Sequence, residues 1–564
     1  ENLQRLLEDK SFKEEVIHFS IAEEITIVSA AHRPELIPII MRILYGRMRS
    51  KTGSKTQGRA AAGTRMVIVL NFLAGSLPQE IHLFLDLLLE PVKRLTQGSC
   101  LSAVLQSVKT LDLSKVLPLG RQHGLLNGVD VVMKKLGHLI QDYLPKLLQI
   151  TLCTCASVSH ILQQRDQIQP WCINQLKYLR RLGINQIAAF FSDFESYAFT
   201  ADEIDALFHG VVWPQIGRLA SEGQYAPTPL LKLIHIWSKN SRYFPLLAKQ
   251  LPDHPELDIL SNVFALLSSK SIAEPSATVV MDIVDSLLST PDFSPTAQAS
   301  ILTVNDTTFP EPSSTAGESA SMGICLILPH ISTILQHLNK AVGNVERMKK
   351  KKFQTQVSKD LSILSRISRF VQDKEQSSVL INLLMPYLFK PNTSQDTEID
   401  ILETIQNLLQ HCPEPAIFIK PLAALFSVIQ NRLSRQTLCS VFQTLADLDS
   451  TLAYITETVT KLNAFDRQHL DDIDFDERLS AFQLATNSIR EMGKLDMEYL
   501  TAVMHNCFHS IQLGEMTLND SATLCLTAVI QQVVSVDCSE EEYKEVVNRT
   551  LLETLRNCLK SKTE

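Results

Sequence analysis

Apolar residues recur along almost the whole chain at spacings of three and four residues. Representative sets are Ile81, Phe84, Leu85, Leu88 and Val92, and Leu328, Ile331, Ile334, Leu335 and Leu338. This spacing brings the apolar side chains to one face of an α-helix, whereas a half-buried strand alternates at every second position. Convincing pairs of alternating segments joined by Asn-Gly or Asp-Gly turns are absent from the sequence. The pattern therefore predicts an all-α fold.

From about residue 398 onward, the predicted helices come in pairs. The first helices of successive pairs are expected to begin near residues 398, 435, 475 and 520. These spacings approach the period of roughly 40 residues of HEAT and armadillo repeats, in which each helix pair buries its apolar face against the next pair. The sequence therefore predicts a HEAT/armadillo-like α-solenoid of paired antiparallel helices.

Two stretches interrupt the helical pattern. Residues 45–65 are rich in Gly, Lys and Arg, and residues 290–323 have the composition of a loop. We predict an N-terminal helical-repeat section over residues 1–289 that contains the basic loop 45–65, a flexible loop or linker over 290–323, and a C-terminal HEAT-like repeat section over 324–564. Within the first section, Pro214 is expected to interrupt a helix, because proline lacks a backbone N–H.

Composition indicates a large folded protein. With 564 residues, 45% of them hydrophobic, the chain is too long for a single core and apolar enough to fold. The longest uncharged runs, residues 66–79 and 147–164, are predicted to be buried helices, because one is too short for a membrane helix and the other contains several polar residues. We expect no membrane association. The opening segment ENLQRLLEDKSF has the pattern of mid-helix sequence, so we expect the chain to be a piece of a longer polypeptide.

Charge and cysteine usage add two constraints. The formal net charge of -8 is mild for this length, so affinity for nucleic acid must come from local patches. The 11 cysteines are scattered without regular spacing, mostly on apolar helical faces, as buried free thiols are. Their distribution favours a reducing compartment.

The most informative stretch is the basic loop 45–65. No acidic residue occurs between Glu35 and Glu80, while the loop supplies Arg47, Arg49, Lys51, Lys55, Arg59 and Arg65. Glycines within it allow close approach of the backbone to a phosphate, and guanidinium groups bind phosphate oxygens in pairs. These six residues are therefore our candidates for contact with the RNA backbone, which is independent of base sequence and sensitive to salt. A loop docked on an acidic partner protein, or one that is merely solvated, would have the same composition.

A second basic patch lies in the C-terminal section. It consists of Arg347, Lys349, Lys350, Lys351 and Lys352. Such a run is typical of a nuclear-localisation signal, of a phosphate-binding patch, or of the solvated end of a surface helix. The sequence does not choose among these three.

No motif in the sequence indicates catalysis. Gly53 and Gly58 have the spacing of a nucleotide-binding P-loop, but Arg59 and Ala60 follow where that motif needs its lysine and hydroxyl. A pair of cysteines separated by one residue with a single histidine, Cys153, Cys155 and His160, lacks the second ligand pair of a zinc site and is predicted to be core. We therefore predict no catalytic residues, no metal site, no cofactor and no small-molecule substrate, and we expect that the protein is not an enzyme.

An acidic run, HLDDIDFDERL, occupies residues 469–479. Its spacing lacks the glycine hinge of a calcium-binding loop. Because acidic residues are favoured near helix N-termini, the run is predicted to be a solvated turn between repeats that begins a helix. Docking onto a basic partner is the alternative.

Several long blocks carry a specific resemblance. They include RPELIPIIMRILYGRMRSKTGSKTQGRAAAGTRMVIVLNFLAG, LDLSKVLPLGRQHGLLNGV, PTPLLKLIHIWSKNSRYFPLLAKQ, DKEQSSVLINLLMPYL and KLNAFDRQHLDDIDFDERLSAFQ. With these blocks the chain resembles the conserved helical domain of the animal down-regulated-in-metastasis (DRIM) family, very large HEAT-repeat components of the small-subunit processome. The similarity runs over the whole chain, except that residues 296–323 and the segment near Cys153 match poorly.

The resemblance implies a non-catalytic scaffold in the nucleolus and nucleoplasm that supports precursor ribosomal RNA processing and small ribosomal subunit biogenesis. The implied partners are processome proteins, precursor ribosomal RNA and the U-three small nucleolar RNA, contacted directly or indirectly. HEAT-repeat nuclear transport receptors and general protein-docking adaptors are the alternative. Transport receptors typically grip basic cargo with acidic inner surfaces, whereas this chain concentrates cations in residues 42–65 and 347–352.

Overall fold

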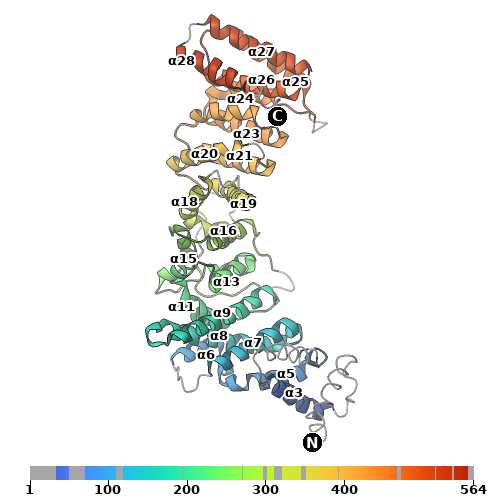
Figure 1. Cartoon of the computed structure of the whole chain (residues 1–564), viewed down its shortest axis with the longest axis vertical. Helices are drawn as coiled ribbons and strands as arrows, with labels where there is room; N and C mark the ends of the chain where they lie inside the picture. Colours follow the sequence, from blue (N-terminus) through green and yellow to red (C-terminus); the bar gives the residue numbers. More distant parts are fainter. Residues whose placement is uncertain are drawn as a thin grey trace. The chain divides into compact units, whose positions relative to one another are not determined.

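The regular structure of this chain is helical. The computed structural model describes residues 33–49, 70, 72–109, 118–194, 196–269, 271–295, 301–309, 321–344, 351–390, 393–466, 472–514, 516–536, 539–554 and 556. In these ranges no strand forms, and the extended pairings are isolated bridges, Lys249 with Thr307 and Phe465 with Ile473. The predicted all-α fold is confirmed, and helices follow one another in stacked layers within each part of the chain (Figure 1).

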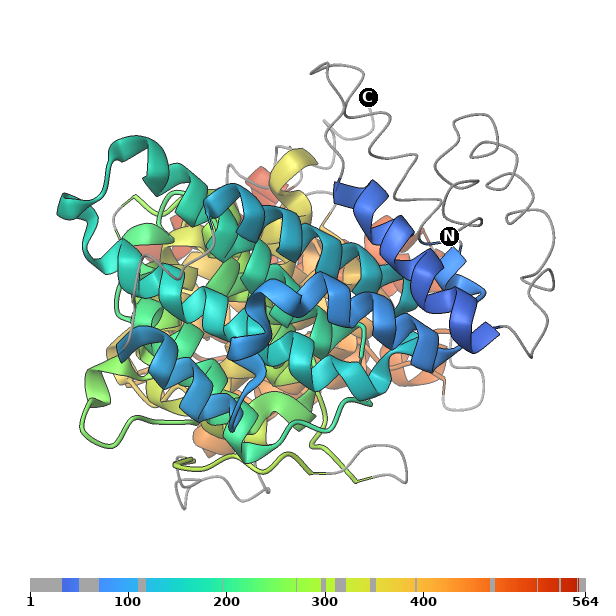
Figure 2. The same cartoon turned by 90° about the horizontal axis from the view of Figure 1, so that it is seen from below.

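The chain divides into two compact units, residues 1–326 and 327–564. In the first unit the longer helices are α3 (Arg33–Arg49), α5 (Pro78–Leu89), α6 (Cys100–Lys109), α7 (Leu119–Leu136), α8 (Leu144–Gln163), α9 (Pro170–Ser192), α13 (Pro229–Ser238) and α16 (Glu274–Ser289). Shorter elements are the 3-10 helix η1 (Glu90–Thr96), α10 (Ala201–Leu207), α11 (Trp213–Ile216), α12 (Leu219–Glu222), α14 (Phe244–Leu247) and α15 (Ile259–Ala265), and α17 (Met322–Ile327) spans the division between the units. Figure 2 shows α3, in dark blue, at the edge of this unit.

The second unit contains α18 (Ile331–Val342), α19 (Lys351–Ser368), α20 (Lys374–Leu388), α21 (Gln395–Leu409), α22 (Ile419–Ala424), α23 (Arg432–Leu448), α24 (Ala453–Leu462), α25 (Phe475–Arg490), α26 (Met497–Leu513), α27 (Met516–Ser535), α28 (Glu540–Tyr543) and a π-helical segment, η14 (Lys544–Leu552). The first helices of the predicted pairs, expected near residues 398, 435, 475 and 520, are α21, α23, α25 and α27. Helix α21 packs against α23, and α25 against both α24 and α27, so each helix pair covers the next. This stacking is the architecture of an α-solenoid.

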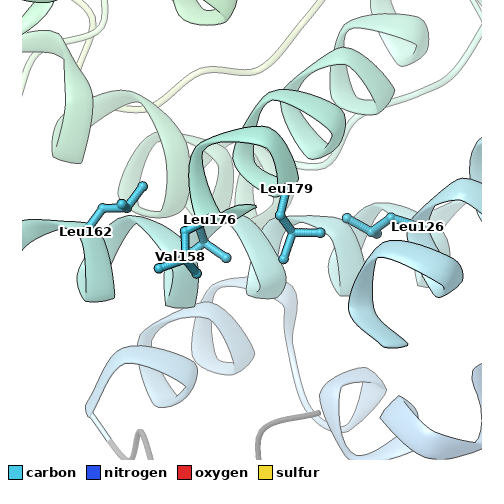
Figure 3. Close-up of a cluster of buried hydrophobic side chains, with 5 residues drawn as sticks. All are labelled: Leu126, Val158, Leu162, Leu176 and Leu179. Carbon is cyan, nitrogen blue, oxygen red and sulfur yellow. The ribbon is translucent and has the colours of Figure 1, made fainter. Parts of the chain in front are cut away.

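Helix α8 shows why the apolar pattern produces stacked layers. It contains the uncharged run predicted from residue 147 to be a buried helix, and it packs against both α6 and α9. On its α9 side, Val158 and Leu162 meet Leu176 and Leu179 of α9 together with Leu126 of α7 (Figure 3). A helix covered on opposite sides needs apolar residues nearly all round, and this explains the uncharged run. No helix in the described ranges combines the length and apolarity that crossing a bilayer requires.

The interruption predicted at Pro214 takes the form of a π-helical segment. Helix α10 continues into residues Phe208–Val212 with π-type backbone bonding, and α11 begins at Trp213. Proline cannot donate the backbone bond that an α-helix requires at this position, and a π-bulge is a common way to absorb such a break.

Part of the predicted linker is held against the first unit. Gln250 N donates a hydrogen bond of 2.8 Å to the carbonyl of Asp306, and Thr308 N donates one of 3.1 Å to the carbonyl of Ala248. Leu302 is buried, at 6% exposure. Residues 301–309 therefore form a strap on the helical body. The linker assigned to residues 290–323 and its boundaries stay a prediction.

Candidate nucleic-acid interface

Helix α3 carries the first part of the predicted basic loop. It runs from Arg33 to Arg49, so residues 45–49 are its last turn, and this corrects the predicted start of the loop at residue 45. Tyr, Arg and Met are compatible with helix, and the single Gly46 costs only about 1 kcal/mol there. The candidate contacts Arg47 and Arg49 thus have helical backbone. The remaining candidates of this loop lie outside the described residues: Lys51, Lys55, Arg59 and Arg65.

The second basic patch belongs to the other unit. Lys351 and Lys352 form the first turn of α19, whereas Arg347, Lys349 and Lys350 lie outside the described residues. Positive charge at a helix N-terminus opposes the helix dipole, so these two lysines are not placed to stabilise their own helix.

Sequence reasoning missed a groove beside α3. The cavity has a volume of about 330 Å³ and lies where α3, α5, η1 and α8 meet. Its lining is formed by Pro38, Arg42, Leu83, Asp86, Leu87, Leu89, Glu90, Lys93, Thr96, Tyr143 and Lys146. Of the charged lining residues, only Arg42 of α3 could have been identified from the sequence as a candidate for phosphate contact. The others come from distant segments that folding brings next to α3.

In this groove the carboxylate of Asp86 has a hydrogen-bond partner, whereas three cations have no ion-pair partner among the described residues. The Tyr143 hydroxyl donates a hydrogen bond to a carboxylate oxygen of Asp86, and burial together with this carboxylate raises the Tyr143 pKa. Lys146 Nζ lies 4.5 Å from the centre of the Tyr143 ring. Within the described part of the chain, Arg42, Lys93 and Lys146 have no carboxylate within ion-pair distance. The groove, which also contains Asp86 and Glu90, therefore presents three cations that form no ion pair with a described carboxylate.

The groove is lined by the same helix, α3, that carries the start of the predicted basic segment. Arg49 follows Arg42 by seven residues, which is about two helical turns, so α3 itself connects the two. Arginine and lysine side chains bind phosphate oxygens, and such contacts position a nucleic acid without reading its bases.

A second feature missed from the sequence is a pair of buried arginines in the other unit. Arg435 donates to Asn463 Oδ1 at 2.9 Å and to the carbonyls of Phe426 and Ile429 at 2.6 and 2.7 Å. Burial lowers the Arg435 pKa to about 9 and the Arg478 pKa to about 10. Arg478 Nε donates to a backbone carbonyl, while its two other nitrogens have no hydrogen-bond partner among the described residues. Both side chains are 1% exposed, so they hold helices together and are out of reach of a ligand.

The two cysteines weighed for metal binding belong to the core. Cys153 and Cys155 are free thiols, buried on α8 as predicted. Burial raises the pKa of Cys153 to about 11 and that of Cys155 to about 12. Among the described residues, no group of three or more His, Cys, Asp or Glu side chains is placed to hold a metal ion.

The acidic run begins a helix, as predicted. Asp474 is the N-cap of α25 and accepts from Glu477 N at 3.0 Å, with Asp476 and Glu477 in the first turn. Residues 469–471 of the run lie outside the described part. The carboxylates complement the exposed N–H groups of the helix end.

Comparison with known proteins gives a match over nearly the whole length. Residues 1–563 match the family described as "U3 small nucleolar RNA-associated protein 20, N-terminal". A protein of that name from Schizosaccharomyces pombe is 22% identical over 578 residues, covering 100% of this chain and 22% of the relative. The Saccharomyces cerevisiae protein of the same name is 22% identical over 493 residues, covering 86% of this chain and 18% of the relative. The chain thus spans less than a quarter of the length of these relatives.

Proposed function

The chain belongs to the family of U3 small nucleolar RNA-associated protein 20, matching its N-terminal region, and from this premise we propose that it is part of a non-catalytic scaffold of the small-subunit processome. The match over residues 1–563 carries the proposal and confirms the resemblance seen in the sequence. In this role the protein supports precursor ribosomal RNA processing and small ribosomal subunit biogenesis in the nucleolus and nucleoplasm. Processome proteins, precursor ribosomal RNA and the U-three RNA are its partners.

The architecture supports a scaffold. Each helix pair in a solenoid contacts its neighbours, and such proteins offer extended surfaces to partners. Several acid–base groups with strongly shifted pKa values, namely Arg435, Cys155 and His509, are buried in helix packing, which is a structural use of those residues.

The mode of RNA contact that we propose is electrostatic. Residues 47–65 track the RNA backbone, and the groove cations Arg42, Lys93 and Lys146 extend this surface along α3, η1 and α8. Each neutralised phosphate releases counterions, so binding weakens as salt rises.

The test is crosslinking of the full-length protein to RNA in cells. Wild type is compared with a variant in which Arg47, Arg49, Lys51, Lys55 and Arg59 are all changed to Ala. Loss of crosslinks to precursor ribosomal or U-three RNA, with processome assembly intact, is the expected result.

A charge-matched control changes five exposed cations elsewhere to Ala, namely Lys134, Lys135, Lys374, Lys494 and Lys544, and it should keep the crosslinks. Unchanged crosslinks in the basic-segment variant would contradict RNA contact by that segment and favour docking on a partner protein. Absence of the protein from processome particles would overturn the scaffold function itself.

A further inference from the structure

Helix α9 presents an exposed face with large aromatic side chains. Trp171 is 62% exposed and Tyr178 is 54% exposed, although the interior side of the same helix is packed against α8 and α13. The two aromatic residues are seven positions apart, which is about two turns or 10 Å along the axis. Asn174, Arg181 and Asn185 are also exposed and share this face by helical spacing.

Helix α9 itself carries cations and no carboxylates. Between Gln167 and Ser192 the sequence contains no Asp or Glu, while Lys177 and Arg181 are exposed. Neither cation has an ion-pair partner within the described ranges. A merely solvated helix face would ordinarily mix charges of both signs and expose few large aromatic side chains.

The aromatic side chains are held in place by neighbours. The ring of His123, on α7, stacks on Tyr178 with ring centres 4.8 Å apart and planes 28° from parallel. A ring nitrogen of His123 lies 3.3 Å from the carbonyl oxygen of Gln175, which fixes the histidine on α9. Trp171 Nε1 donates a hydrogen bond of 2.6 Å to Gln169 Oε1. Aromatic rings that are ordered before binding lose little conformational freedom when a ligand stacks on them.

We infer that the α9 face, defined by Trp171, Asn174, Tyr178, Arg181 and Asn185, is a stacking platform for unpaired bases of single-stranded RNA. Exposed aromatic rings accept base faces, neighbouring cations meet the phosphates, and the two amide side chains offer hydrogen bonds to base edges. A protein partner would also favour Trp, Tyr and Arg. The lack of carboxylates on α9 itself favours a polyanion. This site goes beyond the proposed function and is independent of whether the basic segment touches RNA.

Tryptophan fluorescence gives a readout specific to this face. The chain has three tryptophans, and Trp213 and Trp237 are buried, at 9% and 0% exposure. A base stacked on the α9 face would therefore quench the emission of Trp171 and leave that of the other two unchanged. The experiment titrates the purified 564-residue chain with single-stranded oligoadenylate and, in parallel, with an RNA duplex of equal length. We expect quenching by the single strand and much less by the duplex, whose paired bases are held inside the helix and cannot be splayed onto an aromatic ring.

Affinity measurements on variants complete the test. Trp171→Ala and Tyr178→Ala are each expected to weaken binding of labelled oligoadenylate by about tenfold, because stacking on one ring contributes on that order. Trp171→Phe should restore most of the affinity, since it keeps a ring. Tyr225→Ala is the matched control, because Tyr225 is 73% exposed in the same unit but outside this face, and it should leave affinity unchanged.

Two results would overturn the inference. The first is a single strand that leaves Trp171 emission unaltered. The second is a Trp171→Ala Tyr178→Ala double variant that keeps wild-type affinity for RNA. If that variant also fails to pull down processome proteins, the α9 face binds protein and not RNA. In the five-alanine variant of the basic segment, the single strand should still quench Trp171 emission. The fluorescence test of the α9 face is therefore separate from the crosslinking test of the basic segment.

Discussion

Lys249 and Asp205 form a buried ion pair that fastens the strap of residues 301–309 to helix α10. Lys249 Nζ lies 2.8 Å from Asp205 Oδ1, and the lysine side chain is only 4% exposed. The same ammonium group donates to the carbonyl of Asn305 at 2.8 Å, and Asn305 Nδ2 donates to Asp205 Oδ2 at 3.1 Å. The lysine therefore joins a helix and a non-helical segment that are about 100 residues apart in sequence.

Lys249→Met is expected to release this strap and to destabilise the first unit by about 2 kcal/mol, because the Asp205 carboxylate, 20% exposed, would lose its cation and keep only the hydrogen bond from Asn305. Hydrogen exchange measured by mass spectrometry should show faster exchange in residues 301–309. The control is Lys134→Met, which removes a surface pair with Asp130 whose lysine is 60% exposed. Such pairs contribute about 0 to 1 kcal/mol, so the control should leave exchange unchanged. Equal exchange in the two variants would contradict a role for Lys249 in holding the strap.

Arg435→Leu is expected to destabilise the second unit by about 3 to 5 kcal/mol, as removal of one member of a buried polar network does. The guanidinium fork reaches Asn463 and two backbone carbonyls, and the variant leaves those acceptors buried without donors. Arg435→Lys should recover only part of the loss, because a single ammonium group cannot span the same acceptors. Denaturant unfolding followed by circular dichroism measures both. Arg490→Leu, at an exposed position on α25, is the control, and a loss as large as that of Arg435→Leu would show the network to be unimportant.

Acid should destabilise the second unit through His509. Burial, with the nearby Arg435 and Arg478 cations, lowers the His509 pKa to about 2. The folded unit therefore keeps this histidine neutral, while the unfolded chain takes up a proton below its ordinary pKa of about 6.5. The free energy of unfolding is therefore at its full value above pH 6.5 and decreases as the pH falls, by about 2 kcal/mol between pH 6.5 and 5. His509→Gln should flatten the pH dependence of the denaturation midpoint in this range, and parallel profiles for the two proteins would refute the assignment.

Gly183→Ala should destabilise the contact between α8 and α9. A Cβ atom at Gly183 would lie 2.4 Å from Cys155 Sγ, which is buried. Relief of such overlap by shifting packed helices typically costs about 1 to 3 kcal/mol. Gly124→Ala on α7 is the matched control, because nothing lies within 4 Å of its added methyl group, and it should stabilise its helix by about 0.5 to 1 kcal/mol. Thermal unfolding of the two variants should thus shift in opposite directions.

The helical pairs of the second unit were predictable because the signal is local. Apolar spacing places one face of each helix toward the core, and caps such as Asp474 before α25 and the left-handed Gly514 after α26 set the ends. The predicted starts near residues 435 and 520 differ from those of α23 and α27 by a few residues only. Helix ends commonly shift by this amount, since the terminal turns depend on neighbours.

The sequence contains a pattern from which the α9 face could have been proposed. Trp171, Tyr178 and Arg181 follow helical spacing in a stretch without acidic residues, but the sequence does not say whether such a face is buried. In an amphipathic helix, large aromatic residues normally point to the core. Only the packing of α9 against α8 and α13 shows that these two rings point away from it.

The sequence by itself determined the helical class, the paired repeats and the basic character of residues 47–65, because periodicity and composition are properties of the chain that need no partner segment. The tertiary structure decided which distant residues meet: Lys93 and Lys146 in the groove beside Arg42, Lys249 with Asp205, and Arg435 with Asn463. These contacts depend on how the helix layers stack. Stacking is driven by burial of apolar area, which is non-directional and does not specify which polar residues will be paired. The polar contacts then form wherever the stacked layers bring donors and acceptors within reach.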